Sequence, residues 1–133
     1  MRLVVDTNIL ISAIIKPGKT REIIFNLGFE FFTPAYTLTE LRKHKEEICE
    51  KARVSRPDFE SFLEILFRYV KIINPEIYSS FLKEAGTLIK DVKDVSFLAC
   101  ALALQCIIWS NDYGFKEQDK VEVFTTRDLL GNL

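Results

Sequence analysis

Four acidic residues stand out in this chain of 133 residues, because each lies next to a predicted strand end or near the start of a predicted helix. They are Asp6, Glu40, Asp94 and Asp112. Two unit charges about 4 Å apart repel by roughly 4 kcal/mol at an effective dielectric of about 20, so four ionised carboxylates share a pocket only with protons or cations. Oxygen ligands suit Mg²⁺ or Mn²⁺, and pairs of such ions commonly serve phosphodiester hydrolysis. If the four acids converge, the sequence predicts a metal-dependent hydrolytic site.

The elements that must position these acids alternate between strands and helices. Apolar or alternating runs predict strands at 3–6, 29–33, 69–73, 106–110 and 121–125. Helical patterns fill 8–15, 21–27, 36–52, 55–68, 75–90, 91–104 and 125–130, with Thr20 and Ser55 as expected caps and Gly28 as an expected stop. Parallel strands need helical crossovers, so we expect a single domain over 1–133. Its predicted class is α/β, a three-layer α/β/α arrangement around a mostly parallel five-stranded sheet.

This architecture predicts where the acids lie. Ligands of open parallel α/β sheets bind beyond the carboxyl ends of the strands. Asp6 comes at the end of the first predicted strand, Asp112 lies two residues past the fourth, and Glu40 lies early in the helix after the second. The helix of Asp94 must begin near the same edge to deliver the fourth strand in parallel sense through a right-handed crossover. All four acids are therefore expected at one edge of the sheet.

The order of four short motifs resembles the PIN domain, a family of metal-dependent ribonucleases that includes the VapC-type toxins of prokaryotic toxin-antitoxin pairs. The motifs are "VVDTN", "LTEL", "DVKDVSFLACALAL" and "IIWSNDYGF", and the resemblance spans the chain from Leu3 to about Thr126. It implies an endoribonuclease that uses Mg²⁺ or Mn²⁺ and leaves a 5′-phosphate. The acidic metal-binding and catalytic set would be Asp6, Glu40, Asp94 and Asp112, with polar support from Thr7, Asn8, Ser110 and Asn111.

The chain departs from this pattern near its last motif. Many family members carry a further acid where this sequence has Gly114. Asp91 lies one turn before Asp94 and either compensates for that acid or caps the helix. The resemblance also leaves open a non-catalytic module that holds RNA or a partner protein without turnover.

Each acid also has a structural interpretation. Asp6 suits an N-cap, Asp94 suits the start of its helix, and Asp112 suits an ordinary turn. Glu40 lies in a helix rich in surface charge, as does His44, the only histidine, which we expect to be a solvated side chain. An Asp after the first strand also occurs in phosphatases of the haloacid-dehalogenase type. Those enzymes usually need a second acid at the position that Asn8 occupies here.

Charge and composition limit the remaining function classes. Eighteen basic and 19 acidic side chains nearly cancel, which argues against a broad field that attracts nucleic acid. The cysteines Cys49, Cys100 and Cys106 match no zinc spacing and predict reduced thiols in a cytoplasmic protein. We see no secretory signal and no apolar run long enough to span a bilayer.

The apolar residues of the helix at 58–68 exceed one buried face. They are Phe59, Phe62, Leu63, Leu66 and Phe67. Some of them are expected to serve an interface, either in a homodimer or with an antitoxin protein. The predicted partners are thus an RNA substrate, an antitoxin and a second copy of the chain, with no membrane.

Overall fold

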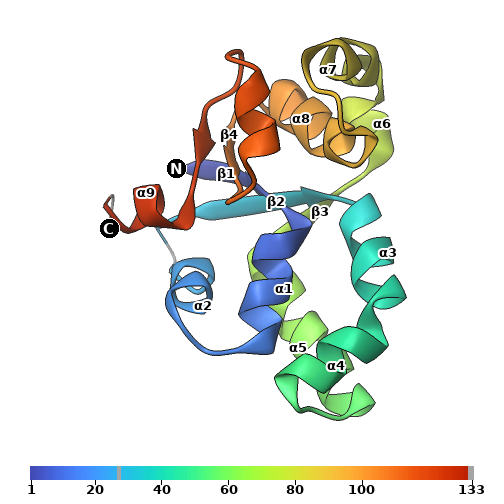
Figure 1. Ribbon diagram of the computed structural model, residues 1–133, viewed down its shortest axis with the longest axis vertical. Helices are drawn as coiled ribbons and strands as arrows, with labels where there is room; N and C mark the ends of the chain where they lie inside the picture. The colour runs from blue at the N-terminus through green and yellow to red at the C-terminus, as the bar shows by residue number, and fades with distance from the viewer. Residues whose placement is uncertain (27, 132–133) are drawn as a thin grey trace.

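The fold, taken from a computed structural model that describes residues 1–26 and 28–131, is built on one parallel sheet (Figure 1). Its strands within these residues are β1 (Arg2–Val5), β2 (Glu30–Pro34), β3 (Val70–Ile73), β4 (Ile107–Trp109) and β5 (Val123–Phe124). They pair in the order β3-β2-β1-β4-β5, and every neighbouring pair is parallel. The predicted α/β class with a five-stranded, mostly parallel sheet is confirmed.

The connections between the strands are helical, as parallel pairing requires. Before β3 the helices are α1 (Thr7–Ile15), α2 (Lys19–Ile24), α3 (Tyr36–Lys43), α4 (Lys45–Ala52) and α5 (Arg56–Tyr69). After β3 come α6 (Pro75–Tyr78), the 3₁₀ helix η1 (Ser79–Phe81), α7 (Leu82–Leu88), α8 (Val92–Leu104), the 3₁₀ helix η2 (Tyr113–Glu117) and α9 (Thr126–Leu130). Ser55 caps α5 as expected, because its Oγ accepts the N–H of Asp58 at 3.2 Å.

Three predicted helices differ from the observed ones. The helix predicted at 36–52 breaks at His44 into α3 and α4, and the one predicted at 75–90 is divided into α6, η1 and α7. The prediction of Thr20 as a cap is wrong, because α2 starts at Lys19 with Gly18 at its N-cap position. The predicted stop at Gly28 is also wrong, because α2 ends at Ile24, and the Gly28 N–H donates to Asn26 Oδ1 at 2.8 Å beyond the helix. Residue 27, the predicted last residue of that helix, lies outside the described residues.

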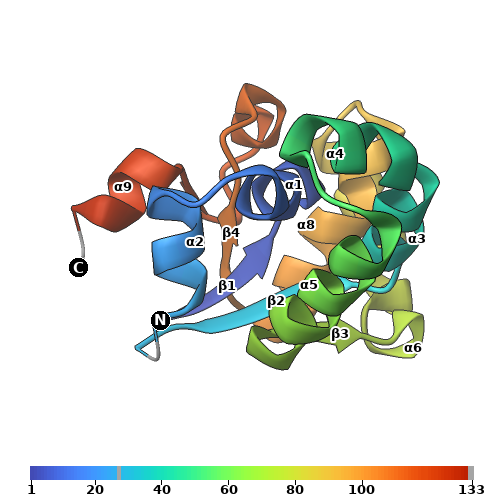
Figure 2. The ribbon, with the colours of Figure 1, turned by 90° about the horizontal axis from the view of Figure 1, so that it is seen from below.

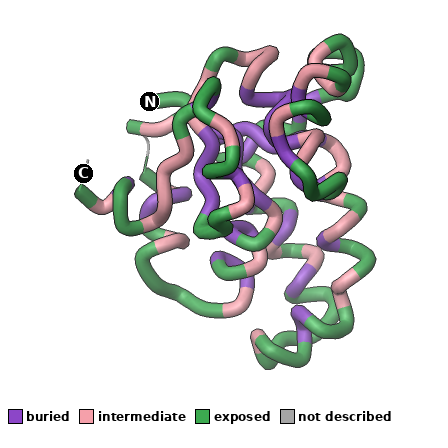
Figure 3. Tube along the Cα trace, turned by 45° about the horizontal axis from the view of Figure 1, so that its top comes forward, coloured by how far each residue is buried: buried purple, intermediate pink, exposed green. Residues whose placement is uncertain are grey.

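Helices cover both faces of the sheet (Figures 1 and 2). Helices α1, α2, α4 and α5 lie on one face and α6 to α8 on the other. Strand side chains alternate between these layers, so Leu3 and Val5 enter the first core while Val4 enters the second. The buried stretches run through the middle of the molecule (Figure 3). Burying both faces of the central strand explains the unbroken apolar run before Asp6.

Several residues that the sequence predicts to lie in the core or at an interface pack between these layers. In α5, Phe59, Leu63 and Leu66 are buried, and Phe62 and Phe67 pack against the same core. Trp109 and Cys100 are fully buried, Cys49 is buried and Cys106 is half-buried, and the three cysteines are free thiols. None of the helices in the described part of the chain has the length and apolar character needed to cross a membrane.

Candidate functional site

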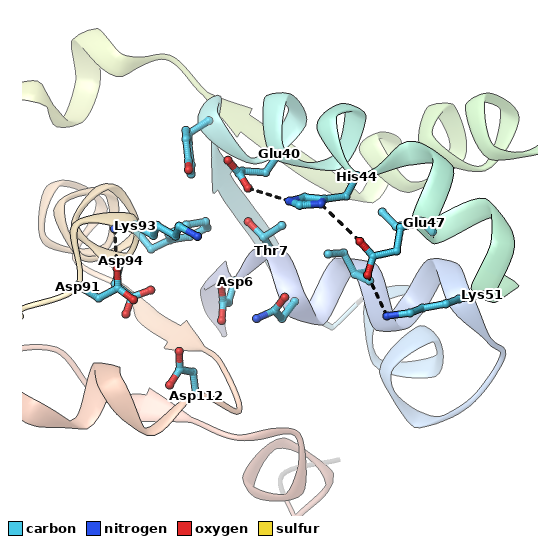
Figure 4. A pocket seen from close by; sticks show the side chains of 15 residues that line it. Asp6, Thr7, Glu40, His44, Glu47, Lys51, Asp91, Lys93, Asp94 and Asp112 are labelled. Carbon is cyan, nitrogen blue, oxygen red and sulfur yellow. Dashed lines mark hydrogen bonds and ion pairs between the residues drawn. The ribbon is translucent and has the colours of Figure 1, made fainter. Parts of the chain in front are cut away.

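The four acids predicted from the sequence line one cavity of about 360 Å³ at the carboxyl edge of the sheet (Figure 4). Asp6 follows β1, Glu40 comes from α3, Asp94 from the first turn of α8, and Asp112 lies three residues past β4. Strands β1 and β4 are neighbours at the point where the strand order reverses, which is where open α/β sheets form a crevice. The fold therefore brings four separate segments to one place.

Ser110 fixes the two acids that follow the central strands. Its Oγ donates to Asp6 Oδ2 at 2.8 Å and accepts the N–H of Asp112 at 3.0 Å. Although Asp6 occupies the N-cap position of α1, its side chain makes no capping bond there. Burial raises the pKa of Asp6, and the charge of Asp112 adds to the rise. The hydrogen bond from Ser110 and the backbone N–H groups of Thr7 and Asn8 oppose this rise, so the Asp6 carboxylate is held at the start of α1 and lines the cavity.

Asp94 is the most perturbed acid of the site. It is only 8% exposed, and burial raises its pKa to about 7. After burial, the charges of four other carboxylates contribute to this rise, those of Asp91, Asp6, Asp112 and Glu117. Asp91, not Asp94, caps α8, because Asp91 Oδ1 accepts the Lys93 N–H at 3.0 Å. Asp94 therefore faces the cavity with more negative charge around it than the protein neutralises.

A buried threonine network sets the position of α3 and hence of Glu40. The Thr33 hydroxyl donates to the carbonyl oxygen of Val5 at 3.1 Å and lies 2.7 Å from the Thr37 hydroxyl. At the start of α1, Thr7 Oγ1 donates to Thr37 Oγ1, and the two oxygens are 3.5 Å apart. These bonds join the end of β1, the end of β2 and the first turn of α3. Glu40 follows Thr37 by three residues, so it lies on the same side of the helix.

Glu40 begins a row of polar side chains that leads away from the other acids (Figure 4). The Tyr36 hydroxyl donates a hydrogen bond that lowers the pKa of Glu40. Glu40 Oε2 lies 3.5 Å from His44 Nε2, His44 Nδ1 lies 3.7 Å from Glu47 Oε2, and Glu47 Oε1 lies 3.2 Å from Lys51 Nζ. His44 is half-exposed and borders the cavity, so it is not a freely solvated side chain.

The predicted supporting residues divide into two groups. Thr7, Asn8 and Asp91 line the cavity. Ser110 does not line it, but its side chain donates a hydrogen bond to Asp6, which does. Asn111 does not line it; its side chain bonds both Oγ1 and the N–H of Thr126, at 3.1 and 2.9 Å, and so fastens the start of α9.

Sequence reasoning missed several side chains that line the cavity, namely Tyr36, Lys93, Glu47 and Lys51. Tyr36 had one signal, since it precedes Glu40 by four residues and thus shares its helix face. Lys93 had another, because it adjoins Asp94 in the first turn of α8. Both side chains line the cavity because α3 and α8 begin beside it.

The donor set fits a hard divalent cation in its chemistry. The ligands available are carboxylate and hydroxyl oxygens, which Mg²⁺ and Mn²⁺ prefer. Burial and then the charges of neighbouring carboxylates raise the pKa of Asp94, and a cation would balance those charges. At Gly114 a Cβ would lie 3.3 Å from Asp94 Oδ2 and 3.4 Å from Asp112 Oδ1, so both carboxylate oxygens lie close to the glycine and a side chain there would crowd them. Among the described residues, however, no three such ligand side chains are close enough to hold a metal.

Comparison with known proteins decides the family. The PIN domain family matches residues 4–130, which is nearly the whole chain. The chain belongs to the PIN domain family. The resemblance noted in the four motifs is thereby confirmed. No curated protein sequence gave a match.

Solved structures with the same fold as this PIN domain come from VapBC proteins. One is VapBC2 from Rickettsia felis bound to a DNA fragment from its promoter, with a TM-score of 0.70 at 20% identity, covering 94% of this chain and 98% of that chain. Another is VapBC-1 from nontypeable Haemophilus influenzae, with a TM-score of 0.72 at 18% identity, covering 96% and 99%. At these identities the likeness establishes the fold of the PIN domain.

Proposed function

We propose that this PIN domain is an endoribonuclease dependent on Mg²⁺ or Mn²⁺ and the toxin of a toxin-antitoxin pair. The observation that carries the proposal is the gathering of Asp6, Glu40, Asp94 and Asp112 around one cavity. Membership of a family that includes metal-dependent ribonucleases supports the same reaction. The balance of charge over the whole chain gives no general attraction for RNA, so binding depends on local contacts and cations.

The chain's own residues would prepare the site for hydrolysis. Asp6, Glu40, Asp94 and Asp112 would hold the cation, with Asp91 at the cavity wall beside them. Bound Mg²⁺ or Mn²⁺ supplies the positive charge that activates water and stabilises the phosphate in the transition state. Ser110 restrains the Asp6 carboxylate, and the threonine network restrains the helix that carries Glu40. Preorganisation of this kind reduces the rearrangement needed when substrate binds.

The test is RNA cleavage by the full chain with Mn²⁺, compared between wild type and Asp94→Asn. We expect the substitution to lower the cleavage rate by about 100-fold or more, because it removes a charged ligand at the reacting centre. EDTA should abolish cleavage by the wild type, and added Mn²⁺ should restore it. Asp119→Asn is the matched control, since Asp119 is exposed and does not line the cavity. Equal cleavage by wild type and Asp94→Asn contradicts the proposal.

The second candidate is a PIN domain that binds RNA or protein without turnover. It is favoured by Gly114, where many relatives have an acid, and by the spacing of the carboxylates in the described chain. Isothermal calorimetry separates the two functions. A binding module takes up RNA in EDTA and leaves it intact after Mn²⁺ is added.

The proposed protein partners are an antitoxin and a second copy of the chain, acting in the cytoplasm. The structural neighbours are VapBC proteins, which favours an antitoxin. Ile65 and Tyr69 remain exposed on α5 after its other large apolar residues enter the core, and they are available to an interface. A strictly monomeric species in sedimentation at micromolar protein, with no co-purifying protein, argues against both partners.

A further inference from the structure

Lys93 brings a positive charge into the cavity that the acids share. It lies in the first turn of α8 directly before Asp94, and it lines the cavity although the residue is exposed. Its backbone N–H donates to Asp91 Oδ1 at 3.0 Å, so the base of the side chain is fixed at the start of the helix. Most lysines are exposed and solvated, so exposure assigns no role to this one. Its direction and its partners do.

The Lys93 side chain is directed across the cavity. It extends from α8 toward the part of the cavity that carries Glu40, a residue of α3 (Figure 4). The pKa of Glu40 is lowered mainly by the hydrogen bond from Tyr36, and the charge of Lys93 adds to this change. The ammonium group therefore acts on an acid of a different helix, in agreement with the direction of its side chain.

Lys93 differs from the other lysine of the cavity in its partners. Lys51 also lines the cavity, but its Nζ is paired with Glu47 Oε1 at 3.2 Å. Among the described residues, Lys93 takes part in no ion pair. When the carboxylates are engaged with a cation, their attraction for Lys93 is weakened. A phosphate that enters the cavity then offers this lysine an anion.

We infer that Lys93 is a catalytic residue whose ammonium group donates a hydrogen bond to a non-bridging oxygen of the RNA phosphate that is attacked. This inference rests on the proposed function and adds to it a residue that contacts the substrate. In the reaction the water oxygen bonds to phosphorus, the bond from phosphorus to the 3′ oxygen breaks, and the 3′ oxygen takes up the proton that the water loses. A cation placed beside the non-bridging oxygens stabilises their charge in the transition state, while Lys93 itself neither gains nor loses a proton.

The first experiment measures binding of a short fluorescein-labelled RNA by anisotropy, with Ca²⁺ in place of Mn²⁺ and a gel to check that the RNA stays intact. Lys93→Met removes the charge and keeps most of the side-chain length, and it should raise Kd by about tenfold, the effect of one charge-assisted hydrogen bond. The slope of log Kd against log salt concentration should fall by about 0.7 to 0.9, the contribution of one phosphate contact. Lys93→Arg keeps the charge and should bind within about threefold of wild type.

The matched control is Lys90→Met, which removes the same net charge. Lys90 is exposed, precedes α8 and does not line the cavity. It should bind RNA within about twofold of wild type, because solvent and salt screen a charge at that distance. Equal loss of RNA binding in Lys93→Met and Lys90→Met would overturn the inference, since only the net charge would then matter.

Mn²⁺ binding without RNA distinguishes a contact with phosphate from a structural role. If Lys93 only maintained the arrangement of the acids, Lys93→Met would bind Mn²⁺ more weakly in calorimetry. The inference predicts that Lys93→Met binds Mn²⁺ as tightly as wild type or more tightly, because a positive charge has left the cavity. Weaker binding of Mn²⁺ and RNA together would contradict it.

Cleavage assays with Mn²⁺ separate this inference from the proposed function. We expect kcat/KM of Lys93→Met to fall by about tenfold or more, while Lys90→Met cleaves as the wild type does. A wild type that binds RNA through Lys93 but never cleaves it contradicts the nuclease and supports the phosphate contact. A wild type that cleaves RNA, with the same kcat and KM in Lys93→Met, supports the nuclease and contradicts the contact.

Discussion

At the scale of single residues, Asp94 shows how a site can oppose the stability of the fold that carries it. The pKa of the buried Asp94 carboxyl is about 7, against an ordinary value of 3.8, so ionising this group at neutral pH lowers the stability of the fold. Between these values the folded chain binds more protons than the unfolded chain. The free energy of unfolding must therefore fall as pH rises through this window, and the loss is complete above about pH 7.

Replacing this carboxyl should stabilise the protein in alkaline solution. Asp94→Asn removes the charge, so its free energy of unfolding should exceed that of the wild type by about 1 to 3 kcal/mol at pH 8 and differ little at pH 4. Urea unfolding at both pH values, without divalent metal, measures the difference. Asp119→Asn should show no such pH-dependent gain. A wild type as stable as Asp94→Asn at pH 8 would mean that the Asp94 charge is already compensated.

The acids themselves could be found from the sequence, whereas their surroundings could not. Asp6 and Asp112 follow predicted strands, so the parallel sheet alone places them at one edge. The hydrogen bond from Ser110 to Asp6 joins residues 104 positions apart, and the Thr33 to Thr37 network depends on how α3 meets β1. Such contacts arise from packing between elements, which the periodicity of apolar residues in the sequence does not predict.

At the scale of elements, the break at His44 was the main feature hidden from the sequence. No Gly or Pro marks the position, and charges continue through it on both sides. The break lets α3 stay at the carboxyl edge with Glu40 while Ile48 of α4 turns into the core beside α1. One straight helix over 36–52 would serve only one of these needs. The helix boundary therefore reflects the site and the core together.

The end of α8 offers a stability test that is independent of the site. Gln105 ends this helix in the left-handed region, at φ 53° and ψ 52°, where a side chain is strained and glycine is not. Gln105→Gly should stabilise the protein by about 1 kcal/mol, as measured by urea unfolding. RNA cleavage should be unchanged, because Asp94 lies at the other end of α8.

The control for this substitution is Ala103→Gly, two residues earlier in the same helix. It places glycine in a helical interior, where glycine destabilises by about 1 kcal/mol relative to alanine. Opposite signs for the two substitutions are expected. If both destabilise, the Gln105 side chain contributes a contact that outweighs its backbone strain.

At the scale of the whole molecule, the topology concentrates negative charge at one edge of a nearly neutral chain. The strand order was not predictable from periodicity, because it depends on which side of β1 each crossover takes. Once β2 and β4 flank β1, the segments that carry Glu40, Asp94 and Asp112 line the same cavity as Asp6. The fold therefore stores electrostatic repulsion that a bound cation would relieve.

Mn²⁺ or Mg²⁺ should accordingly stabilise the whole domain. A ligand that binds only the folded chain adds about 2.7 kcal/mol at a concentration of 100 times its Kd, which raises Tm by about 5 to 10 °C in a domain of this size. The rise should be larger at pH 8 than at pH 5, because protons occupy Asp94 at the lower pH. Calorimetry with Mn²⁺, and then with excess EDTA, measures the shift and its reversal. Asp94→Asn should lose most of the rise while Asp119→Asn keeps it, and an equal rise in both would place the bound metal away from the four acids.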